Sequence, residues 1–398
     1  MKKRSENYSL QSVVDFIRDN FGIGFVPLHR PVFEGNEKQY LMDCIDSNFV
    51  SSVGEQVVRF EKQIADFTGA KYAVATVNGT VALQVALQLS GVQRDDEVIT
   101  QALTFVATAN AISYTGASPV FVDVDRDTMG MSPNALQFFL EEHAEKRTDK
   151  VYNKSTGRRI SACVPMHTFG LPCRIEEILA LCNEWGIEVV EDSAESLGSY
   201  VGKRHTGTFG KSGVISFNGN KVITTGGGGM IITDDEALAE RAKHITTTAK
   251  IPHAFEYVHD EIGYNYRLPN INAALGCAQM ERLLEFLEIK AQLAGRYREL
   301  FGGLDIDFAW AREGSTANYW LNAMVLTSID ERDAFLTYTA ENDIMARPVW
   351  CLMSNLKMFS HCQKDELENS IWLEKRVVNL PSSVPDGAIE AQCEKKSN

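Results

Sequence analysis

The chain has 398 residues, of which 44% are hydrophobic and 23% are charged. These proportions match ordinary globular proteins and exclude a chain that is largely disordered, collagen-like or coiled-coil. Its 53 acidic residues outnumber the 39 Lys and Arg residues and leave a net charge of -14. Binding to nucleic acid or to anionic membranes in general needs a positive surface, so we expect neither partner. A local basic pocket for a small phosphorylated molecule is compatible with this charge.

The N-terminus and the cysteines are typical of a cytoplasmic protein. Lys2, Lys3 and Arg4 are followed by polar residues, and Asp15 interrupts the first apolar stretch, so we expect no signal peptide. No run reaches the roughly 18 apolar residues of a membrane span. The eight cysteines are scattered and form no Cys-x-x-Cys pair. This usage favours a reducing compartment over a disulfide framework or a zinc site, so we predict a cytoplasmic protein without a bound metal.

Over the first 270 residues, short apolar runs alternate with amphipathic segments, which indicates a largely parallel α/β sheet. In chain order we expect strands at 72–77, 97–100, 119–124, 162–165, 187–191, 214–217 and 230–233. We expect one helix to end at Thr68 and others to span 81–89, 104–114, 133–143 and 175–185. The polar, basic stretch at 144–160 is interpreted as an exposed hairpin insertion, with an anion-binding element as the alternative.

A long helical run from about Asn272 to Phe301 precedes a strand–helix–strand pattern. We expect its strand at 320–326 and its helix at 330–342. The domain boundary is placed along the long helix. We therefore predict a larger α/β domain with the N-terminal segment at 1–270. The connecting helix and a smaller C-terminal α/β domain would occupy 271–398.

Two segments follow predicted strands and carry groups suited to binding and catalysis. Asn78-Gly79-Thr80 lies between a strand and a helix, where free amide groups and a hydroxyl can hold a phosphate. An ordinary strand-to-helix turn is equally compatible with this segment. Glu191-Asp192 ends a later strand, and ligands of open α/β sheets bind beyond the carboxyl ends of strands. Either carboxylate could be catalytic or could simply cap a helix or a turn.

Lys221 lies between a predicted strand and the glycine run at 226–229. A lysine held in a pocket there could bond to a carbonyl carbon, whereas a solvated charge is the plainer interpretation. The glycine run does not match the dinucleotide fingerprint, because glycine would be needed at Ile231 or Ile232. The segment before the long helix contains Asn265 and Arg267, which could reach an anion or could merely form a loop.

Together these segments resemble the fold-type-I, pyridoxal phosphate-dependent sugar-nucleotide aminotransferases of the DegT/StrS type. The resemblance covers about residues 25–300 and implies a large domain with a mostly parallel central sheet plus a smaller C-terminal α/β domain. The matching segments, in chain order, are Asn78–Leu83, Asp96–Ile99, Thr104–Asn110, Gly116–Phe121, Glu191-Asp192, Ser216-Phe217, Lys221 and Asn265–Arg267.

The resemblance implies a role for each matching residue. Lys221 would bond to the cofactor and then carry the proton between substrate and cofactor carbons. Asp192 would pair with the pyridine nitrogen, and Phe105 would lie against the ring. Asn265 would act from the neighbouring subunit, so the resemblance implies a homodimer with shared active sites. The residues placed around the cofactor phosphate are Gly79, Thr80, Ser216 and Asn265.

Two positions depart from the common family pattern. Glu195 stands where Gln or His is frequent, facing the cofactor hydroxyl, and a carboxylate there would have to share or donate a proton. The glycine run at 226–229 stands where Gly-Glu-Gly-Gly is common, which makes this loop looser.

Within the family, the segments 48–54, 100–105 and 156–159 resemble most the branch that aminates a UDP-linked 4-keto-6-deoxy N-acetylhexosamine. That branch leads to legionaminic acid and related bacterial surface sugars, with L-glutamate as the expected amino donor. The alternatives are the GDP-linked sugar that leads to perosamine, a 3-keto sugar, a sugar dehydratase, or a non-catalytic family member. Candidate substrate contacts are Arg267, Arg30 and His167, although a hydrogen-bonded core histidine is an equal interpretation of the last.

Overall fold

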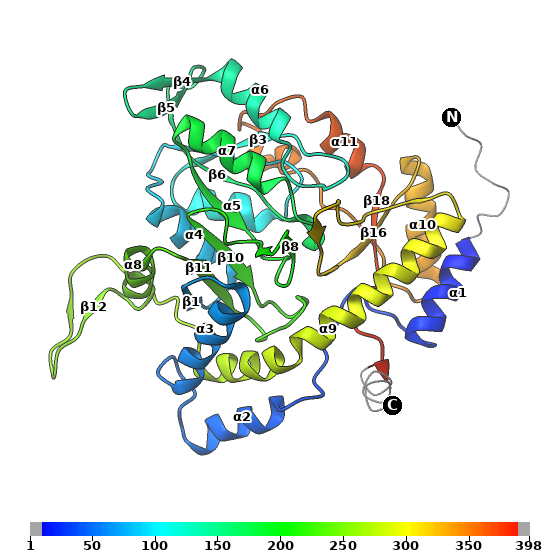
Figure 1. The fold of residues 1–398 in the computed structure, drawn as a ribbon, viewed down its shortest axis with the longest axis horizontal. Coiled ribbons are helices and arrows are strands. Elements are labelled where there is room, and N and C mark those ends of the chain that lie inside the picture. Colours follow the sequence, from blue (N-terminus) through cyan, green and yellow to red (C-terminus); the bar gives the residue numbers. More distant parts are fainter. Residues whose placement is uncertain (1–9, 389–398) are drawn as a thin grey trace.

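The structure, a computed structural model, describes residues 10–388. Its larger domain is built on a central sheet in which the strands follow the order β1-β11-β10-β7-β6-β2-β3 (Figure 1). The bounds are β1 (Tyr72–Thr76), β2 (Glu97–Gln101), β3 (Ser118–Val122), β6 (Arg159–Val164), β7 (Glu188–Asp192), β10 (Ser212–Ser216) and β11 (Gly229–Thr233).

These seven strands run in one direction except for β11. β2 is parallel to β3 and β6, and β7 is parallel to β6 and β10. β11 is antiparallel to both of its neighbours, β10 and β1. The mostly parallel sheet predicted from the sequence is therefore confirmed. As a consequence, the carboxyl ends of six of these strands meet at one edge, where ligands of such sheets bind.

Alternate strand residues face two different helix layers, as the two-residue repeat of a strand requires. Val98, Val190 and Val214 pack with α4, α5 and α8 on one face. On the other face, Ile99 packs with α6 and α7, and Ile215 packs with α3. These helices are α3 (Glu55–Thr68), α4 (Gly79–Leu89), α5 (Val106–Tyr114), α6 (Pro133–His143), α7 (Ile175–Trp185) and α8 (Glu236–Thr246). The result is a three-layer α/β/α domain.

The long helix α9 (Asn270–Gly303) joins the two domains (Figure 1). Its first half packs on the central sheet through residues such as Ala273 and Phe286, together with α3. Its second half packs in the smaller domain through Tyr297 and Phe301. Long as α9 is, no helix among residues 10–388 has both the length and the apolar character needed to cross a bilayer.

The smaller domain contains a sheet in the order β14-β16-β18-β17, with α10 (Ile329–Glu341) beside it. The N-terminal helix α1 (Leu10–Phe21) also packs here, and Figure 1 shows it beside α10. Val13 and Ile17 of α1 share a core with Phe335. The apolar stripe of α1 is thus covered by α9 and α10. The strands are β14 (Asp307–Phe308), β16 (Asn322–Val325), β17 (Arg347–Pro348) and β18 (Val377–Leu380).

The basic stretch at 144–160 forms a hairpin of β4 (Ala144–Arg147) and β5 (Lys150–Asn153), and β5 continues onto the central sheet. Two of its cations have local partners. Arg159 pairs with Asp96 at 2.8 Å, and Arg158 donates to the Ser118 hydroxyl at 2.8 Å. Both partners lie at the amino ends of strands, opposite the edge where ligands bind. The hairpin interpretation is therefore the one that the structure shows.

Phe60 fastens α3 to the sheet and to α9. Its ring is completely buried, meets the Phe217 ring edge-on at 4.9 Å, and contacts the backbone side of α9 at Gly276. We predict that Phe60→Ala lowers the free energy of unfolding by about 3–5 kcal/mol, because it removes a buried ring and leaves a cavity. Val58→Ala on the exposed side of the same helix is the control and should change it by less than about 0.5 kcal/mol. Urea unfolding measures both values, and equal effects of the two variants would contradict this account of the packing.

Candidate active site

A cavity of about 320 Å³ lies at the carboxyl edge of the central sheet. Segments that follow β1, β2, β6, β7 and β10 supply most of its wall, and the smaller domain adds two tryptophans. The lining residues are Asn78, Gly79, Thr80, Leu83, Phe105, Ala107, Thr108, Met166, Asp192, Ala194, Glu195, Ser216, Asn218, Asn220, Lys221, Gly228, Trp320 and Trp350. Most of the side chains singled out in the sequence therefore share one cavity.

One end of the cavity is formed by the start of α4. The Asn78 side chain accepts a hydrogen bond from the Val81 amide at 3.0 Å and thereby caps the helix. The amides of Gly79 and Thr80 precede the helix's own hydrogen-bond ladder, so they are available to an anion. A Cβ atom at Gly79 would lie 3.1 Å from that of Ser216, which brings the Ser216 hydroxyl close to this backbone. The geometry suits a phosphate group.

Asp192 projects into the cavity from the end of β7. Its carboxylate accepts hydrogen bonds from the Thr108 hydroxyl at 2.7 Å and from the Ala194 amide at 3.1 Å. The residue is only 5% exposed. Two donors hold its orientation, so the carboxylate is presented to the cavity in a defined position. It can hold a cationic group of a ligand there.

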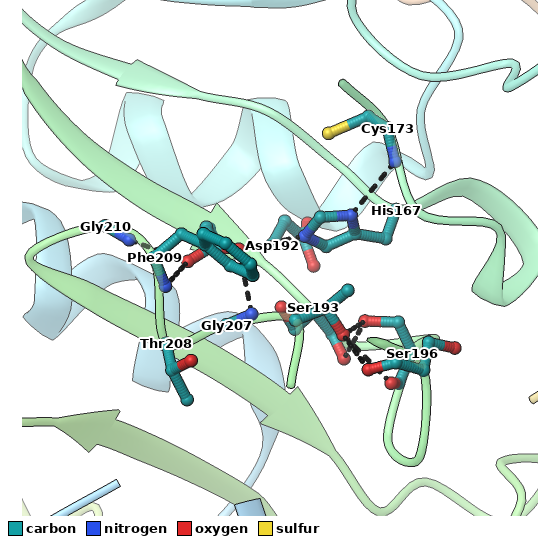
Figure 2. A network of polar contacts seen from close by, with 12 residues as sticks. His167, Cys173, Asp192, Ser193, Ser196, Gly207, Thr208, Phe209 and Gly210 are labelled. Atoms are coloured by element: carbon teal, nitrogen blue, oxygen red, sulfur yellow. Dashed lines mark hydrogen bonds and ion pairs between the residues drawn. The ribbon is translucent and has the colours of Figure 1, made fainter. Parts of the chain in front are cut away.

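Glu191 is directed away from the cavity, because neighbouring side chains of a strand alternate between faces. Its fully buried carboxylate accepts amide hydrogen bonds from Gly207, Phe209 and Gly210 at 2.8, 2.6 and 2.7 Å. It also lies 3.0 Å from the ring nitrogen Nε2 of His167. Figure 2 shows this network around the end of β7. Glu191 is therefore a structural partner that anchors the loop after β9 (Arg204–His205) to the strand.

Lys221 and Glu195 meet inside the cavity. The Lys221 Nζ atom lies 3.3 Å from a carboxylate oxygen of Glu195 and 3.9 Å from the centre of the Trp320 ring. The second carboxylate oxygen of Glu195 accepts the Phe169 amide at 2.9 Å. Burial raises the pKa of Glu195 to about 7, and the nearby Lys221 opposes that increase. Glu195 can therefore carry a proton near neutral pH and exchange it with a ligand.

The three predicted substrate contacts do not line this cavity. His167 is fully buried and is held between Glu191 and the Cys173 amide, which matches the interpretation as a hydrogen-bonded core histidine. Arg30 is paired with the exposed Asp386 near the C-terminus, and its contact with substrate stays a prediction. Arg267 donates to the side-chain oxygen of Asn265 at 2.9 and 3.1 Å.

Several lining residues were not assigned roles from the sequence. Thr108 lies one helical turn after Phe105, so the position of that aromatic residue could have indicated it. Met166, Trp320 and Trp350 carry no comparable signal, since two of them come from the distant smaller domain. Phe105 itself is 48% exposed, and its ring faces that of Trp350 at 6.1 Å.

One group of possible metal ligands occurs among residues 10–388, outside this cavity. His244, Asp260 and Glu261 lie within reach of a common point. Arg241 is paired with Glu261, and His244 with Asp260 at 2.7 Å. These ion pairs explain the cluster without an ion.

The family model of the DegT/DnrJ/EryC1/StrS aminotransferases matches residues 31–387, which is most of the chain. The chain belongs to this family. It is accordingly a pyridoxal phosphate-dependent sugar aminotransferase. The cavity fits that cofactor, because it offers an anion-binding helix start, an ionisable carboxylate, a lysine and an exposed aromatic ring.

Relatives of this aminotransferase cover nearly its full length. It is 40% identical to the pyridoxal phosphate-dependent aminotransferase EpsN of Bacillus subtilis, over 89% of this chain and 90% of that protein. It is 36% identical to the GDP-perosamine synthase of Escherichia coli O157:H7, over 90% and 93% of the two chains. Among solved structures, the aminotransferase TlmJ of Streptoalloteichus hindustanus superposes with a TM-score of 0.82 at 26% identity. That match covers 92% of this chain and 96% of that chain.

Glu195 predicts a pH-dependent component of stability in the cofactor-free aminotransferase. Its pKa is about 7 in the folded protein against an ordinary value of 4.5. The folded state thus holds a proton that the unfolded state has released, so this group makes stability fall as the pH rises from about 4.5 to about 7. Glu195→Gln removes this titrating group. The free energy of unfolding of Glu195→Gln minus that of wild type should therefore increase across that pH window, by on the order of 2 kcal/mol, and then stay constant. Urea unfolding at several pH values measures the difference, and a constant difference would contradict the assignment.

Proposed function

We propose that this aminotransferase moves an amino group from L-glutamate to the 4-keto carbon of a nucleotide-linked 4-keto-6-deoxy sugar. A UDP-linked N-acetylhexosamine on the way to legionaminic acid is the first candidate, in bacterial surface-sugar biosynthesis. The observation that carries the proposal is the meeting of Lys221, Asp192 and the start of α4 in one cavity. Together they offer a nucleophilic amine, an anionic partner for a cationic ring and a phosphate site.

In this proposal, each residue has a separate task. The cofactor, when bound, supplies an electron-accepting ring. Asp192 holds the protonated ring nitrogen, and its two hydrogen-bond donors keep the carboxylate aimed at that place. The amine of Lys221 attaches the cofactor and moves the proton at the substrate carbon. Phe105 covers one face of the ring with its exposed side chain.

The phosphate end of the site would use the start of α4. The amides of Gly79 and Thr80 and the hydroxyls of Thr80 and Ser216 are donors of the kind that bind phosphate. Glu195 would face the cofactor hydroxyl and share a proton with it, for which its pKa of about 7 is suited.

The GDP-linked sugar that leads to perosamine is the second candidate substrate. The observation that favours it is the similarity to proteins named GDP-perosamine synthase, at 36% identity for the Escherichia coli protein and 35% for that of Vibrio cholerae. Both candidates are 4-keto sugars, so the choice concerns the nucleotide and the group at the sugar's second carbon. The cation that faces the diphosphate is proposed to be Arg267.

We also propose a homodimer whose subunits share their active sites. Asn265 does not line the cavity of its own chain, and its side-chain oxygen is occupied by Arg267, which leaves the amide group to donate outward. Nearby, the hairpin of β12 (Lys250–Ile251) and β13 (Val258–His259) projects from the large domain as an arm (Figure 1). Phe255 and Tyr257 on this arm are 80% and 83% exposed. Apolar side chains on such an arm favour contact with another subunit.

Replacing Lys221 tests the core of the proposal. Lys221→Ala should lower turnover by several orders of magnitude while leaving the melting temperature close to wild type, because the amine that attaches the cofactor is lost. Lys211→Ala is a matched control, since that lysine is paired with Glu188 at 3.1 Å and does not line the cavity. Its turnover should stay near wild type. Wild-type turnover by a folded Lys221→Ala protein would refute the assignment.

Mixing two inactive variants tests the shared sites. Lys221→Ala and Asn265→Asp should each have little activity, the second because a carboxylate repels the cofactor phosphate. After subunit exchange, each mixed dimer has one site with both native residues, so activity should reappear. Glutamate-dependent amination by the mixture is the measurement. Activity no higher than the average of the two variants would show that Asn265 acts within its own chain or not at all.

The substrate is tested with a panel of keto sugars. Glutamate alone should change the cofactor absorbance, and the accepted keto sugar should restore it, because the single amine of Lys221 serves two half-reactions. We expect the UDP-linked 4-keto sugar to restore it fastest, with the product mass showing one new amino group. Preference for the GDP-linked sugar would select the second candidate. Reaction with neither would contradict a 4-keto substrate.

A further inference from the structure

Trp320 makes a contact with Lys221 that the proposed catalytic roles do not include. Its ring lies 3.9 Å below the Nζ atom, within the range of a cation–π interaction. The indole N–H donates to the carbonyl of Asn220 at 2.6 Å, which ties the ring to the residue preceding Lys221. Trp320 is 4% exposed, so this contact is largely shielded from water. The ring is thus fixed with its face toward the amino group.

The turn that carries this ring is strained and well anchored. Tyr319 has a φ of 47°, a left-handed conformation that a bulky side chain rarely adopts. The side-chain amide of Asn318 donates to the carbonyls of Glu195 and Leu197, both at 2.9 Å. Its side-chain oxygen accepts the Trp320 amide at 2.8 Å. Strain of this kind persists only where surrounding contacts enforce it, and it is concentrated at functional sites.

A third contact holds the turn from the side of α9. Lys290, which is 1% exposed, donates from its amino group to the Trp320 carbonyl at 3.2 Å. The Asn318–Trp320 turn therefore positions both neighbours of the Lys221 amino group. Trp320 supplies the aromatic face, and Asn318 holds the backbone of Glu195, whose carboxylate lies 3.3 Å from the amino group.

We propose that Trp320 is a positioning residue that holds the protonated amino group of Lys221 beside Glu195 whenever that group is not bonded to the cofactor. The inference rests on the proposed role of Lys221. In each half-reaction, the amine leaves the cofactor and must return to it from the right direction. A lysine on its flexible four-carbon chain would otherwise sample several rotamers. The aromatic face on one side and the carboxylate on the other restrict it to one place.

Trp350 offers a matched comparison. It lines the same cavity from the same domain, but its ring contacts are with Phe105 at 6.1 Å and with Phe169 at 5.1 Å. A variant at this position also removes an indole from the wall of the cavity. A general effect of opening the cavity would appear in both variants, whereas loss of the aromatic face at Lys221 would appear only at Trp320.

The test measures the amino group itself in the cofactor-free protein. A brief pulse of acetic anhydride is followed by mass spectrometry of the Lys221 peptide, with exposed Lys62 as the internal reference. Trp320→Leu should raise the acetylation rate of Lys221 on the order of three- to thirty-fold, the range that cation–π energies imply. Trp320→Phe should keep most of the protection, and Trp350→Leu should stay within about twofold of wild type. Equal rates in wild type and Trp320→Leu would overturn the proposal, as would an equal rise in Trp350→Leu.

A second measurement separates the electronic contact from simple shielding. Fluorinated tryptophans weaken the negative face of the indole with little change of shape. The protein is produced with tryptophans that carry an increasing number of fluorine atoms. The acetylation rate of Lys221 should then rise step by step in the wild type, whereas it should not change in Trp320→Phe. Absence of that gradation in the wild type would overturn the proposal. Borohydride reduction of the cofactor-loaded protein, with peptide mapping, tests the attachment of Lys221 separately and so distinguishes failure of the proposed function.

Discussion

The end of β7 is the point on which the site depends, because two adjacent carboxylates there serve opposite faces of the sheet. Glu191 is buried and receives three backbone amides, so a loop from the far side of the strand is locked to it. A buried carboxylate is costly unless donors surround it, and here they do. The strand is thereby fixed, and Asp192 beside it faces the cavity in a defined orientation. The hydrogen bonds that fix Glu191 on one face of the sheet therefore help to fix the orientation of Asp192 on the other face.

The second constraint is the junction of the two domains. Lys290 of α9 buries its amino group and donates to carbonyls of Trp320 and Ser382, while His29 lies 3.1 Å away. Burial lowers the pKa of Lys290 to about 7, so the cost of a charge there is substantial. One side chain thus links α9, the wall of the cavity and the C-terminal segment. Because of this junction, the smaller domain forms part of the wall of the cavity.

In a chain with this negative net charge, the positions of individual cations decide where a diphosphate could bind. A protein of net charge -14 needs specific cations where it meets a diphosphate. Arg159 of the basic stretch is paired with Asp96 at the amino end of β2, and Arg30 is paired near the C-terminus. Within residues 10–388, the Arg267 guanidinium donates to the side-chain oxygen of Asn265, which is neutral, so its charge is not offset by that contact. In the proposed homodimer, Arg267 would act together with Asn265 at the neighbouring subunit's site.

The sequence by itself determined the local chemistry: the alternation of strands and helices, the long helix α9, and the order of Gly79, Asp192 and Lys221 at strand ends. These features follow from local periodicity and from the rule that parallel strands share one carboxyl edge. Only the tertiary structure decided which side chains complete the cavity. Trp320 and Trp350 arrive from the smaller domain, α1 packs against α10, and His167 turns into the core toward Glu191. Such contacts join segments far apart in the chain. They depend on packing and burial, and no periodic pattern in the sequence predicts them.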